Sequence, residues 1–288
     1  MMIQEIYDLA EDVLNTEDHV RINYENVEKL GKKMLSEGIQ PFFIQNDTGY
    51  QTGIYIEILK ELVASSINYC YWYGCCDIRP NGSSSTKMYD IVNCEFKNIG
   101  VSNLKFDYII DNIIKRLSKN KFPLIEERKR HLYELIEKNG ELFAKMVKNK
   151  TFSGKRLFEF MIENFQGFAS DMFSKRACLF FIQLYRKYDW WKDDLMKIIP
   201  IPADYQVPKM LRHYGCIELS EKLNHKIANH KIIHKHSIEE VKIRAATITV
   251  CKQLQEITNW LTPDIDTYLW MKRKTINIPF HLTYTTDY

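Results

Sequence analysis

The stretch Pro202-Ala-Asp-Tyr-Gln-Val-Pro208, followed by Lys-Met-Leu-Arg-His-Tyr-Gly215, decides how this chain is organised. Proline suits the first turn of a helix and glycine suits the left-handed residue that ends one. We therefore expect a helix of about two turns between Pro208 and Gly215. Asp204 then lies in the loop that leads into this helix. Its carboxylate either caps the helix, forms an Asx-turn, or is a reactive group held by a stiff loop.

Length and composition indicate a chain that is folded throughout. Its 288 residues are 45% hydrophobic and 13% aromatic, which is enough to bury a large core. We predict a mainly α-helical fold in a single domain over residues 1–288. In this prediction a helical N-terminal part, 1–120, packs on a helical core, 121–288.

Charge and cysteine content restrict the partners and the compartment. The 40 Lys and Arg residues against 37 acids leave a formal net charge of +3, which argues against a stable nucleic-acid complex but allows a small anionic ligand. No apolar run reaches membrane length and the N-terminal sequence lacks the layout of a signal peptide, so we expect no membrane partner. The seven irregularly spaced cysteines suggest free thiols in a reducing compartment, and we expect a cytoplasmic protein. Nothing in the sequence indicates an oligomeric state.

Helical spacing of apolar residues dominates the chain, and from Leu104 onward it predicts helix after helix. The segment 173–185 is apolar on nearly every side once past Arg176, which predicts a helix buried in the middle of the domain. Lys175 and Arg176 stand at the start of that helix. Cations there oppose the helix dipole, so we expect an anion close by.

Two capping patterns mark the last long helices. Ser237-Ile-Glu-Glu240 has the form of a capping box, and Thr262-Pro263 predicts a second cap, at Thr262, with proline at the first helical position. Asp266 then lies about one turn into that helix. An acid at this position either complements the helix dipole or has a chemical role.

The region around residues 67–97 departs from the helical pattern. Asn68-Tyr-Cys-Tyr-Trp-Tyr73 is short and aromatic, and Arg79-Pro-Asn-Gly82 with the following Ser/Thr run is typical of a turn. Residues 87–96 alternate loosely. These features predict a small β-hairpin. The aromatic side chains, Tyr71 and Trp72 among them, either fill the core or form a stacking wall for a flat heterocycle.

The sequence gives no support for a metal site or a cofactor. Adjacent Cys75 and Cys76 do not have the usual spacing of zinc ligands, and no second cysteine pair follows. His230 and His234 share a helical face, but the glutamate of a metalloprotease helix is absent. We expect neither a metal nor a cofactor.

Seven short motifs in register resemble the successive motifs of the queuosine salvage protein family. The resemblance covers the chain from roughly residue 20 to the C-terminus. The motifs are Asn68-Tyr-Cys-Tyr-Trp72, Phe122-Pro-Leu-Ile-Glu-Glu-Arg128, Ser174-Lys-Arg-Ala177, Ala203-Asp-Tyr-Gln-Val-Pro208, Val241-Lys-Ile-Arg244, Asp266-Thr-Tyr-Leu-Trp270 and Pro279-Phe-His281.

This resemblance implies a fold and an activity. Members of the family are queuosine 5′-phosphate N-glycosylases/hydrolases, which release queuine for reuse in tRNA modification. The implied fold is almost wholly α-helical and related to helix-hairpin-helix DNA glycosylases. The expected function is hydrolysis of the N-glycosidic bond of queuosine 5′-monophosphate to queuine and ribose 5-phosphate.

The resemblance also assigns roles to the two aspartates. Cleavage of a ribosyl C1′–N bond passes through a cation-like sugar, which needs a carboxylate beneath C1′ as nucleophile or as stabiliser and water base. By resemblance this residue is Asp204. The base is a 7-deazaguanine with an amidine-like edge, and Asp266 would accept two parallel hydrogen bonds from it. Thr267 would lie near the base, and Ala203 would contribute backbone beside the catalytic carboxylate.

Further contacts are expected around these groups. Tyr71 or Trp72 would stack on the base, and Phe43 would form a wall of the pocket. Lys175 is the candidate for the 5′-phosphate, with Arg176 and Arg212 as reserves.

Two positions depart from the family pattern. Met271 stands where some members carry an acid, and a histidine is missing near Phe43. Both departures bear on the selectivity of the pocket for queuine more than on the hydrolysis itself. Two alternative functions remain: a DNA-base N-glycosylase, and a non-catalytic helical domain that binds a nucleotide or a protein.

Overall fold

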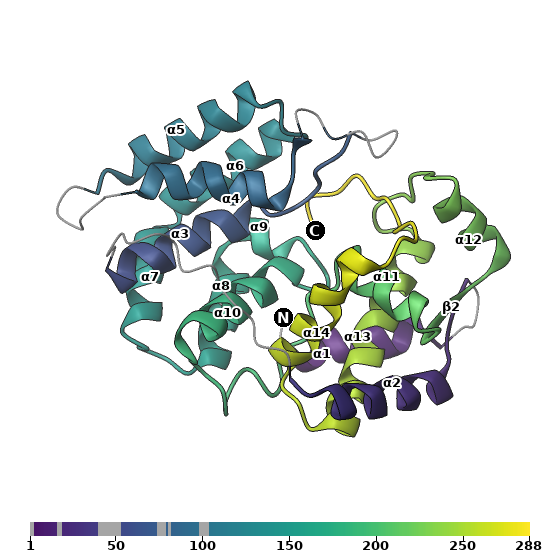
Figure 1. The fold of residues 1–288 in the computed structure, drawn as a ribbon. Coiled ribbons are helices and arrows are strands. Elements are labelled where there is room, and N and C mark those ends of the chain that lie inside the picture. The colour runs from purple at the N-terminus through teal and green to yellow at the C-terminus, as the bar shows by residue number, and fades with distance from the viewer. Residues whose placement is uncertain (1–2, 16–18, 40–52, 74–78, 80–81, 98–103) are drawn as a thin grey trace.

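The computed structural model describes residues 3–15, 19–39, 53–73, 79, 82–97 and 104–288, and helices dominate these residues (Figure 1). This confirms the prediction of a mainly α-helical fold. The helices in chain order are α1 Ile3–Val13, α2 Tyr24–Glu37, α3 Ile54–Ser66, α4 Ser85–Phe96, α5 Phe106–Lys119, α6 Ile125–Glu137, α7 Gly140–Lys148, α8 Gly154–Asn164, α9 Gln166–Ala169, α10 Lys175–Tyr188, α11 Gln206–His213, α12 Glu221–Ala228, α13 Ile238–Thr258 and α14 Thr262–Lys272, with a 3₁₀ helix Arg273–Thr275.

The N-terminal helices pack against the C-terminal third of the chain. Helices α1 and α2 both contact α13, and Figure 1 shows them beside α13 and α14. Strand β1 (Val20–Ile22) pairs antiparallel with β2 (Ile217–Leu219), with Arg21 opposite Glu218. The Arg21 Nη2 to Glu218 Oε2 distance is 2.7 Å. The first and last parts of the chain therefore share one core.

The predicted β-hairpin near residues 67–97 is wrong. Residues 85–96 form helix α4, and Ser84 caps it by accepting a hydrogen bond from the Lys87 N–H at 3.2 Å. The buried side chains of α4 recur at spacings of three and four, which outweighs the loose alternation of the same residues. They are Met88, Ile91, Val92 and Phe96.

Residues 67–73 are irregular rather than a strand. Arg128 of α6 holds them, donating to the carbonyl oxygens of Ile67, Tyr69 and Cys70 at 2.8, 2.6 and 2.6 Å. A buried guanidinium thus satisfies the acceptors that a partner strand would otherwise take.

Helix α10 lies in the middle of the fold, as its apolar sequence predicts. Its residues from Ala177 to Leu184 are buried except for Leu179 and Gln183, and it packs against α3, α8 and α14. The expected anion at its start is Asp171. The Asp171 carboxylate accepts the N–H groups of Phe173 (3.1 Å) and Lys175 (2.7 Å).

The predicted cap at Ser237 is confirmed, whereas the cap predicted at Thr262 is displaced by one residue, because Leu261 is the N-cap of α14 and Thr262 is its first residue. Ser237 accepts a hydrogen bond from the Glu240 N–H at the start of α13, and Pro263 lies in the first turn of α14. Helix α11 ends at His213, and Gly215 beyond it has φ of +68°, the left-handed conformation expected of it. Helix α11 begins at Gln206, two residues before the predicted start at Pro208.

Cysteines and hydropathy add two observations on the described part of the chain. Its five cysteines, Cys70, Cys94, Cys178, Cys216 and Cys251, are free thiols. None of the helices described has both the length and the apolar character that crossing a membrane requires.

Candidate functional site

A cavity of about 410 Å³ brings Asp204 and Asp266 together with Tyr71 and Lys175. Its walls come from the irregular segment after α3, the start of α4, α10, the loop before α11 and α14. The further lining residues are Asn68, Arg79, Ser84, Ser85, Thr86, Tyr89, Leu179, Gln183, Arg186, Pro202, Tyr205, Gln206, Trp270, Arg273 and Tyr288.

Asp204 is held by the helix that it leads into. Its Oδ1 accepts the N–H groups of Gln206 (2.7 Å) and Val207 (3.3 Å), so of the two structural interpretations the Asx-turn is confirmed, while the N-cap of α11 is Tyr205. Within the described residues we find no hydrogen bond to Oδ2. The Asx-turn therefore fixes the carboxylate with one oxygen and leaves the other for the cavity.

The electrostatic surroundings of Asp204 are mixed. Burial raises the pKa of its carboxyl above the usual value, and the nearby Asp266 adds to this rise. The charge of Lys175 and the N–H groups of Gln206 and Val207 oppose the rise. Asp204 thus combines the reactivity of a desolvated carboxylate with partners that favour its ionised form.

Asp266 is one member of a buried ion pair. Arg186 Nη2 lies 2.7 Å from Asp266 Oδ2, and the two side chains are 5% and 6% exposed. The same nitrogen donates to Thr267 Oγ1 at 2.9 Å, while the Thr267 hydroxyl donates to the Pro263 carbonyl at 2.8 Å. These bonds fix the orientation of the Asp266 carboxylate.

Lys175 is buried at the first residue of α10. Its Nζ donates to the Asn68 carbonyl at 3.3 Å. Burial lowers the pKa of the ammonium, and the attraction of Asp204 and Asp171 opposes that change. Lys175 therefore belongs to the same electrostatic cluster as Asp204.

Arg244 of α13 connects the loop that carries Asp204 with the segment before α10. It is fully buried, donating through Nε to the Ala203 carbonyl at 3.0 Å and through Nη2 to Asp171 Oδ2 at 2.8 Å. Because Asp171 also accepts the N–H of Lys175, the first residue of α10, one guanidinium positions both the loop of Asp204 and the start of α10.

Aromatic side chains form the wall of the cavity near Tyr71 and Tyr205. The Tyr71 hydroxyl donates to Asn68 Oδ1 at 2.7 Å, and Tyr71 lines the cavity. Trp72 lies behind this wall, edge-on to Tyr205 with ring centroids 5.0 Å apart. Tyr71 and Tyr205 therefore present surface to a ligand, whereas Trp72 supports Tyr205.

Several residues expected at the site do not line the cavity. Arg176 donates to the carbonyl oxygens of Ser66 and Gly167, and Arg212 donates to the Pro279 carbonyl at 3.0 Å. Both guanidiniums thus serve the packing of the chain. Ala203, Thr267 and Trp72 act from behind the lining residues, and Phe43 lies outside the described residues.

Some lining residues were missed by the sequence reasoning although a signal for them exists. Leu179, Gln183 and Arg186 follow the predicted Lys175 at intervals of four, four and three residues, which places all four on one face of α10. Asp266, Trp270 and Arg273 follow the same rule along α14 and the turn after it. The Ser/Thr run before Lys87 is the start of a helix and not a hairpin turn.

Within the described residues, no group of three or more His, Cys, Asp or Glu side chains is arranged to hold a metal ion. The cavity instead offers two carboxylates, several cations and aromatic rings. The fold and site thus define a helical protein with a pocket for a small polar ligand that carries both hydrogen-bond donors and negative charge.

The chain belongs to the queuosine salvage protein family, since the model of that family matches residues 61–288. One relative is the queuosine 5′-phosphate N-glycosylase/hydrolase of Sphaerobacter thermophilus, 28% identical over 59% of this chain and 60% of that protein. The protein of the same name from Dictyostelium discoideum is 28% identical over 79% of this chain and 77% of its own. The mouse protein of that name is 29% identical over 44% and 42% respectively. The chain therefore spans between 42% and 77% of the length of these three relatives.

A solved structure was also compared. The 8-oxoguanine DNA glycosylase of Pyrobaculum aerophilum, in complex with 8-oxoguanosine, covers 95% of this chain and 89% of its own, with a TM-score of 0.47 at 14% identity. A likeness at this level supports no conclusion, so kinship with helix-hairpin-helix glycosylases stays a prediction.

Proposed function

We propose that this protein hydrolyses the N-glycosidic bond of queuosine 5′-monophosphate and releases queuine and ribose 5-phosphate. The observation that carries the proposal is the meeting of Asp204 and Asp266 in one cavity of a chain that belongs to the queuosine salvage family. Relatives with 28% identity bear the name of this activity.

Asp204 is the catalytic carboxylate in this proposal. As the C1′–N bond breaks, its electron pair goes to the base and positive charge develops on the sugar. The ionised carboxylate stabilises that charge, either by bonding to C1′ or by accepting a proton from the attacking water. Both routes use the oxygen that the Asx-turn leaves available.

Asp266 recognises the base. The amidine-like edge of a 7-deazaguanine presents adjacent N–H donors, and a carboxylate accepts them with charge-assisted hydrogen bonds. The ion pair with Arg186 supports this role because it holds the carboxylate in one orientation before the ligand arrives. Tyr71 and Tyr205 are then the candidates for contact with the ring face.

Lys175 remains our candidate for the 5′-phosphate. Arg79 and Arg273 line the same cavity and replace Arg176 and Arg212 as the further cations available to the phosphate. We also propose that the enzyme acts in the cytoplasm on the free nucleotide, without a stable nucleic-acid complex. The net charge of +3 supports this.

The decisive experiment compares wild type with Asp204→Ala on queuosine 5′-monophosphate and on the unphosphorylated nucleoside, with free queuine followed by mass spectrometry. We expect release by wild type only, and faster release from the monophosphate. Asp107→Asn is the control, because this acid is exposed in α5 and does not line the cavity. If wild type cleaves neither compound, the proposed function is refuted.

A further inference from the structure

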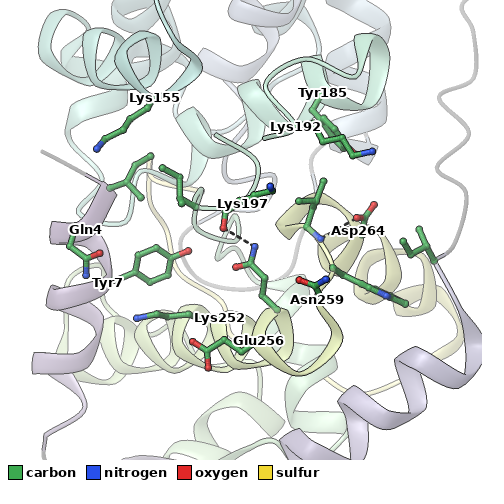
Figure 2. Close-up of a pocket in the computed structure, with 16 residues that line it drawn as sticks. Gln4, Tyr7, Lys155, Tyr185, Lys192, Lys197, Lys252, Glu256, Asn259 and Asp264 are labelled. Atoms are coloured by element: carbon green, nitrogen blue, oxygen red, sulfur yellow. Dashed lines mark hydrogen bonds between the residues drawn. The ribbon is translucent and has the colours of Figure 1, made fainter. Parts of the chain in front are cut away.

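A second and larger cavity, of about 920 Å³, shares no lining residue with the cavity of Asp204 and Asp266. It lies between α1, α13 and the segment after α10 (Figure 2). Gln255 Nε2 donates to the Lys197 carbonyl at 2.9 Å and so joins two of its walls. The two cavities use different residues of α10 and α14: Tyr185 and Asp264 here, Arg186 and Asp266 there.

Tyr7 lies at the centre of this second cavity. Its side chain belongs to the core, with only 8% of the residue exposed, and Figure 2 shows its hydroxyl pointing into the opening. Within the described part of the chain the Tyr7 hydroxyl has no hydrogen-bond partner. The ring is buried while the hydroxyl opens into the cavity, so a ligand in the cavity would accept the hydrogen bond of this hydroxyl. Burial raises the pKa of Tyr7, so the phenol keeps its proton and acts as a donor.

Lysines outnumber acids in the lining of this cavity. Lys155, Lys192, Lys197 and Lys252 line the cavity with two acids, Glu256 and Asp264. Two of these lysines form ion pairs outside the lining, Lys197 with Asp193 at 2.9 Å and Lys252 with Glu11 at 3.1 Å. Lys252 lies over the Tyr7 ring, with Nζ 4.9 Å from its centroid, and Figure 2 shows Lys155 on the other side of Tyr7. Lys155 has no ion-pair partner among the residues described. A phenolic donor between ammonium groups is a setting for an anion.

The remaining surface suits an apolar, flat group. Trp260, Leu261 and Ile198 also line the cavity. Aromatic and aliphatic side chains of this kind contact the faces of heterocyclic rings. The lining therefore combines a region for a negatively charged group with a region for a ring.

We propose that this cavity is a binding site for a nucleoside phosphate, separate from the catalytic cavity. The phosphate would accept a hydrogen bond from the Tyr7 hydroxyl between Lys155 and Lys252, and the base would contact Trp260 and Leu261. The proposal does not depend on which bond, if any, the other cavity cleaves.

Equilibrium dialysis of the full chain with adenosine 5′-monophosphate tests the site, with adenosine and inorganic phosphate as separate probes. We expect saturable binding of the monophosphate that is tighter than that of either part. Tyr7→Phe keeps the ring and removes the hydroxyl, and it should weaken binding about tenfold or more, as for a hydrogen bond to a charged group. The double variant Lys155→Ala/Lys252→Ala should also weaken binding.

Two controls separate this site from its alternatives. The double variant Lys115→Ala/Lys119→Ala removes two exposed lysines of α5 that do not line the cavity, and it should bind as wild type does. Asp266→Asn alters the catalytic cavity and should leave this binding unchanged. The proposal is overturned if no saturable binding occurs, if neither the Tyr7 nor the lysine variant weakens it, or if only Asp266→Asn does. Thermal unfolding shows whether each variant folds. If Tyr7→Phe does not fold, the binding measured for Lys155→Ala/Lys252→Ala decides whether the proposal holds.

Discussion

Arg186 Nη2 lies 2.7 Å from Asp266 Oδ2, and this ion pair connects α10 with α14 at a wall of the cavity. Both side chains are almost fully buried, so each charge depends on the other for its stability. The pair therefore has two roles, one in folding and one in the presentation of the Asp266 carboxylate to a ligand.

Arg186→Leu, compared with the double variant Arg186→Leu/Asp266→Leu, should separate the role of the ion pair in folding from its role in ligand binding. Arg186→Leu alone leaves the Asp266 charge buried without its main partner, and we expect a loss of about 3–5 kcal/mol in the free energy of unfolding. Arg186→Leu/Asp266→Leu removes both charges and should recover much of that loss while remaining inactive. Urea unfolding and queuine release measure the two quantities. Equal stability of the single and double variants would show that the ion pair does not matter for folding.

Asp204→Asn should abolish turnover without destabilising the protein at neutral pH. Asparagine can still form the Asx-turn, but it cannot carry the charge that stabilises the cation-like sugar, so we expect a rate loss of about 10² to 10⁴. Mass spectrometry of released queuine gives this rate. Full activity in the variant would remove Asp204 from the mechanism.

The stability of the same variant should depend on pH in a defined direction. The folded state raises the pKa of Asp204 above its usual value of 3.8, so the folded protein holds this proton more tightly than the unfolded chain does. This difference in the pKa of Asp204 contributes to the free energy of unfolding at pH values below the pKa of the unfolded chain. The contribution is lost as the pH rises through the pKa of the folded protein. At pH 7 wild type therefore carries a buried charge that Asp204→Asn lacks. We expect the variant to be more stable at pH 7 and this advantage to shrink toward about pH 4.

Lys175→Met tests the coupling between Lys175 and Asp204. Loss of the ammonium charge should raise the pKa of Asp204 further, so the acid limb of kcat/KM moves to higher pH. The unphosphorylated nucleoside should show this shift without any contribution from a phosphate contact. Lys175→Arg keeps the charge and should leave the acid limb near its wild-type position.

The monophosphate gives the second readout of the same variant. If Lys175 binds the 5′-phosphate, Lys175→Met loses the preference for the monophosphate over the nucleoside. A lost preference with an unmoved acid limb would assign Lys175 to the phosphate alone. If the acid limb of kcat/KM moves while the preference for the monophosphate is kept, Lys175 acts on Asp204 alone.

Local sequence patterns predict the helical part of this structure well. The buried helix α10, the cap at Ser237, the place of Pro263 in the first turn of α14, and the anion required at Lys175 follow from spacing, turn chemistry and the helix dipole, which act over a few residues. The Arg186–Asp266 pair joins residues 80 positions apart, and no local pattern signals it. The pairing of Asp204 with Asp266 in one site came from the resemblance to a family.

The misassigned region at 67–97 shows a different limit of local reasoning. An irregular aromatic segment beside turn-forming residues has the local appearance of a strand. Its backbone hydrogen bonds are decided instead by Arg128, which lies about 60 residues further on, at separations of 58 to 61 positions. The periodicity of a sequence does not show which distant side chain donates hydrogen bonds to the backbone carbonyl groups of a segment.

Arg128→Leu should accordingly destabilise the fold and disturb the cavity together. Three buried carbonyl oxygens, those of Ile67, Tyr69 and Cys70, lose their donor, and we expect a loss of about 3 kcal/mol or more in the free energy of unfolding. Because the next residue, Tyr71, lines the cavity, the KM for the nucleotide should rise in whatever fraction folds. Arg130→Leu, an exposed change in the same helix, should alter stability by no more than about 0.5 kcal/mol. Urea unfolding of both variants decides the point: if they lose equal stability, the segment holds its shape without Arg128.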